Sequence, residues 1–234
     1  MTSERPRIDV VVPAHDEEDR IGACLGALSR AADRLGAERP EFDVAVTVVL
    51  DGCTDGTAAV VERYPVAALR TEHLGVGRAR TVGTAHALRT HPAAPSRRWL
   101  AHTDADSRVP DGWLVQQADA FTSGAHLLVG AVVPDPDDLD PVVLERWIAA
   151  HPPGAALGHV HGANLGVLAA AYLAVGGFDP VPEHEDVRLV GRAQALGLRV
   201  DATIDLPVVT SGRFAGRTPG GYAEHLRLQY GDAS

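Results

Sequence analysis

Short apolar runs rich in valine and leucine alternate along the chain with longer segments in which apolar residues recur every three or four positions. The first run, residues 8–12, ends at Pro13, and in residues 16–35 Ile21, Leu25 and Leu28 follow at helical spacing. The predicted strands span residues 8–12, 44–50, 66–69, 99–102, 126–133 and 198–202. The predicted helices span residues 16–35, 57–63, 75–88, 113–122, 142–150, 169–175 and 186–196. Strands that alternate with helices predict an α/β fold with a mostly parallel sheet flanked by helices.

The second half of the chain is less regular than the first. Residues 134–141 form an acidic, proline-bearing segment that indicates a loop, and residues 211–221, rich in Gly and Arg, indicate a mobile one. The acidic residues 16–19 are expected to fill the first turn of the first helix, where the helix dipole favours them. A length of 234 residues suits one large domain or two small ones.

Charge and composition remove several classes of function. The formal net charge is -10, and no lysine occurs, so all 21 basic residues are arginine. Schiff-base aldolases, pyridoxal-phosphate enzymes and P-loop kinases each need a lysine. The two cysteines are too few for a four-cysteine zinc site or a disulfide framework. Net acidity disfavours nucleic acid as a partner. An anionic ligand would have to meet arginines, helix N-termini or a bound metal.

Targeting signals are not visible. The longest apolar stretches, residues 44–50 and 125–133, are much shorter than a membrane span, and residues 1–8 contain no apolar secretory core. We therefore expect a reduced, cytoplasmic protein, with peripheral contact at the inner membrane face left open.

Acidic clusters follow three of the predicted strands. They are Asp16 and Glu17, Asp51 and Asp55, and Asp104 and Asp106. A single cluster of this kind is readily explained by turn and N-cap chemistry. Three of them at the carboxyl edge of one parallel sheet predict a shared crevice, where ligands bind in such folds. The Asp104-Ala105-Asp106 spacing suits a hard divalent cation, Mg²⁺ or Mn²⁺, that bridges two phosphates of a nucleotide.

These segments resemble motifs of the family 2 glycosyltransferases, which have the GT-A fold. Pro13-Ala14-His15-Asp16-Glu17-Glu18 resembles their P-A-x-N-E-E opening. Asp51-Gly52-Cys53-Thr54-Asp55-Gly56-Thr57 resembles D-G-S-x-D-G-T, and Gly75-Val76-Gly77-Arg78-Ala79-Arg80 resembles G-x-x-x-A-R-N. Asp104-Ala105-Asp106 is similar to the D-x-D motif, and Gly162-Ala163-Asn164 with Gly176-Gly177-Phe178-Asp179 resembles the acceptor-side motif. Glu185-Asp186 matches the pair that carries the catalytic base. The motifs occur in the family's order over about residues 8–190.

The resemblance implies an inverting transferase that moves a sugar from a nucleoside-diphosphate sugar to a hydroxyl. It implies a single GT-A domain over residues 1–234, with a nucleotide-binding half at about 8–107, an acceptor half at about 108–210 and a flexible tail at 211–234. The residues expected to bind the donor are Pro13, Ala14, Asp16, Glu17, Asp51, Gly77, Arg80, Asp104, Ala105 and Arg213. Asp106 and Asp104 are expected to bind Mg²⁺ or Mn²⁺. Asp186 is the expected base, with Glu185 second, and His161, Gly162 and Asn164 are expected at the acceptor.

Several alternatives stay open at this level. Arg213 is either a free solvated charge or part of a lid that closes over the diphosphate. Residues 183–186 could simply cap a helix, and Trp113 and Trp147 are expected in the core or an interface rather than stacked on a sugar. A UDP-sugar donor is favoured over GDP-mannose by its frequency in the family. The acceptor is expected to be a small molecule or a lipid-linked group, and a homodimer is left open.

The sequence departs from the family pattern at two positions. Asp16 replaces the usual asparagine, and Thr81 follows Arg80 where the family has asparagine. The chain lacks both the Q-x-x-R-W motif and the membrane helices of processive polysaccharide synthases.

Two rival functions are a catalytically idle nucleotide-sugar-binding protein on the same scaffold and a nucleotidyltransferase. The latter is disfavoured because such enzymes carry a Gly-rich Arg/Lys signature after the first strand.

Overall fold

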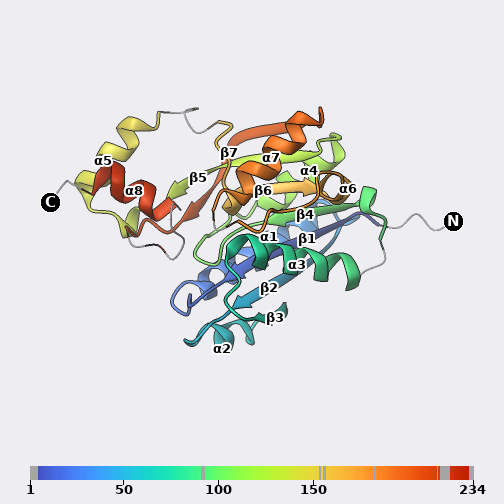
Figure 1. The fold of residues 1–234 in the computed structure, drawn as a ribbon, viewed down its shortest axis with the longest axis horizontal. Helices are drawn as coiled ribbons and strands as arrows, with labels where there is room; N and C mark the ends of the chain where they lie inside the picture. The colour runs from blue at the N-terminus through green and yellow to red at the C-terminus, as the bar shows by residue number, and fades with distance from the viewer. Residues whose placement is uncertain are drawn as a thin grey trace.

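The computed structural model describes residues 5–90, 93–152, 154, 157–181, 183–214, 216 and 222–231. Within them the chain forms a seven-stranded sheet in the order β3-β2-β1-β4-β6-β5-β7 (Figure 1). The strands are β1 (Arg7–Ala14), β2 (Asp43–Asp51), β3 (Ala67–Thr71), β4 (Arg98–His102), β5 (Leu127–Pro134), β6 (Leu165–Leu168) and β7 (Val200–Thr210). Neighbours are parallel from β3 to β4 and from β5 to β7, whereas β6 is antiparallel to β4 and β5. The predicted α/β class with a mostly parallel sheet is thus confirmed.

Helices cover both faces of the sheet. They are α1 (Ile21–Glu38), α2 (Thr57–Val61), α3 (Val76–Thr90), α4 (Trp113–Thr122), α5 (Pro141–Ala150), α6 (Ala169–Ala174), α7 (Glu185–Ala195) and α8 (Tyr222–Tyr230). Because side chains alternate along a strand, β1 serves two cores. Val10 and Val12 pack with α1 and α4, and Val11 faces Gly83 of α3. On that second face, α6 and α7 bury their apolar side chains against β4, β5 and β6.

Several elements differ from the sequence prediction; β7, for example, extends to Thr210 rather than ending at residue 202. α1 begins at Ile21 rather than at residue 16, because the acidic residues before it form a turn in which Asp16 has a left-handed backbone (φ 51°). The four-residue strand β6 was not predicted, since it is short and continues directly into α6. In the expected flexible tail, Leu226 and Tyr230 of α8 pack with Val143 of α5. Figure 1 shows the two helices side by side. Of the expected mobile loop at 211–221, residues 215 and 217–221 lie outside the described part.

The strand order places the acidic clusters at one edge. β1 lies between β2 and β4, and all three run parallel, so their carboxyl ends at Ala14, Asp51 and His102 meet on the same side of the sheet. The chain crosses over between β1 and β4, and such a crossing opens a crevice in which ligands of α/β proteins bind. Among the described residues, no helix is both long and apolar enough to cross a membrane.

Candidate active site

Two cavities lie at this edge and meet at the D-x-D segment. The first has a volume of about 360 Å³ and the second of about 650 Å³. Both are lined by Val76, Asp104, Asp106 and Arg213, so the two spaces form one cleft with a common middle. A cleft of this size, with carboxylates at its centre, can hold two ligands that touch each other at Asp104 and Asp106.

The first cavity collects most of the predicted donor residues. From the ends of β1, β2 and β4 it is lined by Pro13, Ala14, Glu17, Asp51 and Ala105. The Asp51 carboxylate is buried and accepts hydrogen bonds from the Thr71 hydroxyl (2.7 Å), the Leu74 amide (2.7 Å) and the Gly75 amide (2.8 Å). Asp51 therefore shapes this wall of the cavity by holding the loop that leads into α3.

Two histidines that were not predicted also line the first cavity. The rings of His15 and His73 lie 4.4 Å apart between centroids, and His15 Nδ1 is 2.7 Å from the Asp51 carbonyl oxygen. His15 stands inside the first motif, so its position was a signal that could have been used. His73 has no such signal, because it reaches the cavity through a loop.

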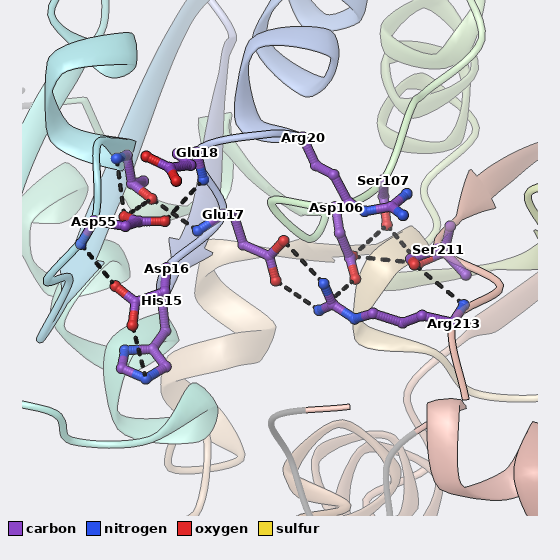
Figure 2. A network of polar contacts seen from close by, with 12 residues as sticks. His15, Asp16, Glu17, Glu18, Arg20, Asp55, Asp106, Ser107, Ser211 and Arg213 are labelled. Atoms are coloured by element: carbon purple, nitrogen blue, oxygen red, sulfur yellow. Dashed lines mark hydrogen bonds and ion pairs between the residues drawn. The ribbon is translucent and has the colours of Figure 1, made fainter. Parts of the chain in front are cut away.

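Three predicted binding residues do not line either cavity. Asp16 turns away from the cleft. Its carboxylate accepts hydrogen bonds from the amides of Thr54 (2.6 Å) and Asp55 (3.2 Å). Figure 2 shows the contact with Asp55. These bonds, that from Thr54 above all, lower the pKa of Asp16. Its role here is to cap the turn that follows β2.

Gly77 and Asn164 serve packing instead. A Cβ atom at Gly77 would lie 3.0 Å from the Asp179 carbonyl oxygen and 3.2 Å from Glu185 Cβ, so glycine lets α3 approach the start of α7. Asn164 is fully buried, accepts a hydrogen bond from Trp113 Nε1 (2.8 Å) and donates one to the Ala131 carbonyl (2.9 Å). The prediction that Trp113 lies in the core agrees with this contact.

The carboxylate of Asp106 is poorly solvated. Its burial, together with the nearby charge of Asp104, raises its pKa to about 6, although Arg213 and Arg20 partly oppose the shift. The Arg213 guanidinium lies 3.1 Å from Asp106 and binds both carboxylate oxygens of Glu17, at 2.6 and 3.1 Å (Figure 2). Arg213 thus joins the C-terminal segment to the loop after β1 across the middle of the cleft.

These carboxylates fit a divalent cation that is shared with a ligand. In the described part of the chain, no three His, Cys, Asp or Glu side chains converge as a metal site. Mg²⁺ commonly takes one or two protein carboxylates and completes its shell with substrate phosphates and water. Asp104 and Asp106 offer such a partial set, and the raised pKa of Asp106 indicates that its negative charge lacks full compensation.

Arg80 connects the two cavities. It is fully buried, and its guanidinium binds the Asp104 carboxylate, the Glu185 carboxylate (3.2 Å) and the Gly162 carbonyl (3.0 Å). A buried guanidinium with three acceptors is well satisfied and holds its partners in fixed positions. A Cβ at Gly162 would lie 2.5 Å from Arg80, so this packing requires glycine at that position.

The two candidate bases differ in their surroundings. Glu185 is buried and paired with Arg80, and burial raises its pKa while Arg80 opposes the rise. Both residues line the second cavity, but Asp186 is only half-buried and accepts a hydrogen bond from the Gly162 amide at 2.6 Å. Asp186 is therefore the better placed of the two to take a proton from a ligand in that cavity.

Aromatic and histidine side chains form much of the second cavity's wall. They are Trp147, His151, His159, His161, Tyr222 and His225. Of these only His161 was a predicted acceptor residue, and Trp147 was expected in the core or an interface. The α8 residues were missed because they lie in a tail that was expected to be flexible.

Comparison with known proteins agrees with this arrangement. The family model described as glycosyl transferase family 2 matches residues 9–166. Comparison with curated proteins gave no match. Among solved structures, S. aureus TarS 1-349 in complex with UDP-GlcNAc has 17% identity and a TM-score of 0.66, with 92% of this chain and 61% of that chain covered.

Two further structures are similar to this chain. The mannosyltransferase PcManGT from Pyrobaculum calidifontis, in complex with GDP-Man and Mn²⁺, has 20% identity and a TM-score of 0.66, covering 97% of this chain and 62% of that one. Glucosyl-3-phosphoglycerate synthase from Mycobacterium tuberculosis, in complex with phosphoglyceric acid, has 17% identity and a TM-score of 0.58, covering 98% and 81%. This chain spans about three fifths of the length of the first two structures.

These likenesses confirm the GT-A fold that the motifs implied. The matched region runs from β1 through the D-x-D segment to β6 and includes all three strand-end clusters, each of which contributes to the lining of the first cavity. Because the family model covers more than half of the sequence and its motifs meet in one cleft, the chain belongs to glycosyl transferase family 2.

Proposed function

We propose that this protein is a metal-dependent, inverting glycosyltransferase that moves a sugar from a nucleoside-diphosphate sugar to a hydroxyl acceptor. The observation that carries the proposal is the meeting of the two cavities at Asp104 and Asp106, with Asp186 on the wall of the second. Structures with the same fold contain UDP-GlcNAc in one case and GDP-Man with Mn²⁺ in another. These ligands support a nucleotide-sugar donor for this chain.

The donor would occupy the first cavity. Its nucleoside would lie against Pro13, Ala14 and the loop held by Asp51, and its diphosphate would reach toward Asp104 and Asp106. Asp104 and Asp106 would hold Mg²⁺ or Mn²⁺, which, when bound, neutralises charge on the departing diphosphate. Arg213, at the middle of the cleft, is placed to bind phosphate oxygens as well. A UDP-sugar remains the favoured donor, with GDP-mannose second.

The acceptor would enter the second cavity with one hydroxyl at Asp186. Asp186 takes the hydroxyl proton while the acceptor oxygen forms a bond to the anomeric carbon. The bond from that carbon to the diphosphate breaks on the opposite side, so the nucleoside diphosphate leaves and the configuration inverts. The transition state resembles an oxocarbenium ion, and a positioned general base typically contributes about 10²–10⁴-fold in rate.

Release of nucleoside diphosphate tests this proposal directly. The intact protein is incubated with UDP- and GDP-sugars in Mn²⁺, with EDTA in a parallel sample. We expect release that requires the metal and that falls at least about 100-fold in Asp186→Asn, while nucleotide binding measured by thermal shift stays unchanged. Glu183→Gln, which changes another carboxylate lining the second cavity, serves as the matched control.

The alternatives predict other outcomes in the same experiment. Turnover that persists in EDTA would contradict a metal role for Asp106, and full activity in Asp186→Asn would move the base, first to Glu185. Nucleotide binding without any release would favour the catalytically idle protein. Absence of a thermal shift with UDP, GDP, CDP and dTDP in the presence of Mn²⁺ would contradict the donor site itself.

A further inference from the structure

The wall of the second cavity carries a set of rings, which we call the ring wall: Trp147, His151, His159, His161, Tyr222 and His225. Trp147 and His151 stack at 4.3 Å between centroids with an interplanar angle of 14°. His161 meets Tyr222 edge-on at 5.9 Å, and Tyr222 stacks with His225 at 6.3 Å. The side chains come from α5, α8 and the segment before Gly162, which are far apart in the sequence.

The ring wall is next to the proposed base. His161 immediately precedes Gly162, whose amide holds the Asp186 carboxylate at 2.6 Å. A ligand that lies on the ring wall can therefore present one of its hydroxyls to Asp186. Flat aromatic surfaces bind the apolar C–H faces of cyclic ligands, and imidazole nitrogens can both donate and accept hydrogen bonds to hydroxyls.

Two of the four imidazoles, His161 and His225, contribute little positive charge at neutral pH. Burial lowers the pKa of His161, with the charge of His159 acting in the same direction and that of Asp186 opposing it. Burial also lowers the pKa of His225, as do His151 and His159. Both groups are therefore mainly neutral near pH 7.

The fixed charges around the second cavity are mostly negative. Among the described lining residues the carboxylates are Asp104, Asp106, Glu183, Glu185 and Asp186, and the guanidiniums are Arg80 and Arg213. With Asp104 and Asp106 assigned to the cation, Glu183, Glu185 and Asp186 are the carboxylates that face an acceptor. Arg80 is already paired with Asp104 and Glu185. Arg213 is paired with Glu17, and the proposed function assigns it to the diphosphate of the donor. A phosphate or carboxylate on the acceptor would meet repulsion here without a free cation among these residues, and like charges placed together cost affinity.

We infer that the acceptor is a cyclic polyol without anionic groups, a sugar, glycoside or cyclitol, whose ring packs on the ring wall while one hydroxyl reaches Asp186. This inference rests on the proposed function and specifies the acceptor of that site. It separates this chain's cavity from one that would receive a phosphorylated or carboxylated acceptor.

Matched pairs of ligands test the inference. The intact protein, saturated with Mn²⁺ and the nucleoside diphosphate that shifts its melting temperature, is titrated with methyl glucoside, glucose 6-phosphate, myo-inositol and inositol 1-phosphate. Binding is followed by saturation-transfer difference NMR. We expect each uncharged ligand to bind at least about tenfold more tightly than its phosphorylated twin. Equal or tighter binding of the phosphorylated twins, or no binding of either uncharged polyol, would overturn the inference.

Variants of the ring wall show whether binding occurs there. Tyr222→Ala and Trp147→Ala should each weaken binding of the uncharged ligand at least about tenfold, whereas Tyr222→Phe, which keeps the ring, should stay within about threefold of the unchanged protein. His86→Ala removes an imidazole from α3 outside both cavities and should have no effect. Unchanged binding in both alanine variants would place the ligand elsewhere and overturn the inference.

The two proposals fail in distinguishable ways. Nucleotide binding and metal-dependent nucleotide release are measured on the same samples, and they depend on the first cavity. A protein that binds nucleotide but prefers phosphorylated acceptors contradicts the inference on the acceptor alone. A protein that binds no nucleotide contradicts the proposed function as well.

Discussion

Replacing Asp106 by asparagine should stabilise the metal-free protein at alkaline pH. The pKa of Asp106 is raised from 3.8 to about 6, mainly by burial and then by Asp104. A carboxylate with a raised pKa costs stability wherever it is charged in the folded state, so the stability present at low pH is lost as pH rises from about 4 to about 6. A difference of about two pH units corresponds to about 3 kcal/mol. Asp106→Asn removes this cost, and Arg213 keeps its pairing with Glu17.

The assay is urea unfolding of both proteins between pH 5 and pH 8. The variant should gain up to about 3 kcal/mol over the unchanged protein at pH 8, and the gain should shrink as pH falls toward 5. Asp33→Asn, at an exposed position of α1, is the control and should change stability by less than about 0.5 kcal/mol.

Metal binding gives a second readout, in which the unchanged protein rather than the variant gains stability. A ligand at 100 times its Kd stabilises the folded state by about 2.7 kcal/mol, so saturating Mn²⁺ should stabilise the unchanged protein and leave Asp106→Asn unaffected. The reasoning would be refuted by a variant that is no more stable than the unchanged protein at pH 8 without metal. Equal stabilisation of both proteins by Mn²⁺ would refute the assignment of Asp106 to the cation.

Three further substitutions test packing around the cleft, each by urea unfolding. His102 is fully buried with both ring nitrogens unpaired, and burial holds its pKa well below the ordinary value. The unchanged protein should therefore lose stability as pH falls below about 6.5, and His102→Leu should be more stable by about 1–2 kcal/mol at pH 6. A less stable variant would argue against an unpaired ring. Gly162→Ala places a methyl 2.5 Å from Arg80 and should cost about 1–3 kcal/mol and lower nucleotide release; unchanged stability would contradict this close packing. Asn164→Ala leaves Trp113 Nε1 without its hydrogen-bond partner and should lower stability by about 1–3 kcal/mol without changing the KM for the acceptor substrate. A raised KM at unchanged stability would instead place Asn164 in the acceptor site.

The sequence alone predicted the fold class and the edge of the sheet at which the first cavity lies. Apolar periodicity depends on local side-chain geometry, so the alternation of strands and helices could be predicted, and with it the sheet edge where Asp51, Asp104 and Asp106 gather. The family motifs then predicted which segments would meet. Short elements such as β6 escaped, because four residues with a glycine carry too little pattern.

Only the tertiary structure decided what individual side chains do within those segments. Asp16 belongs to a predicted motif, yet one left-handed backbone angle turns its carboxylate away from the cleft. Glu185 and Asp186 are adjacent in sequence, and the remote Arg80 distinguishes them by pairing with Glu185. The ring wall brings together α5 and α8, about 70 residues apart in the chain. Side-chain direction and distant partners depend on how the whole chain packs, and no local pattern of residues records them.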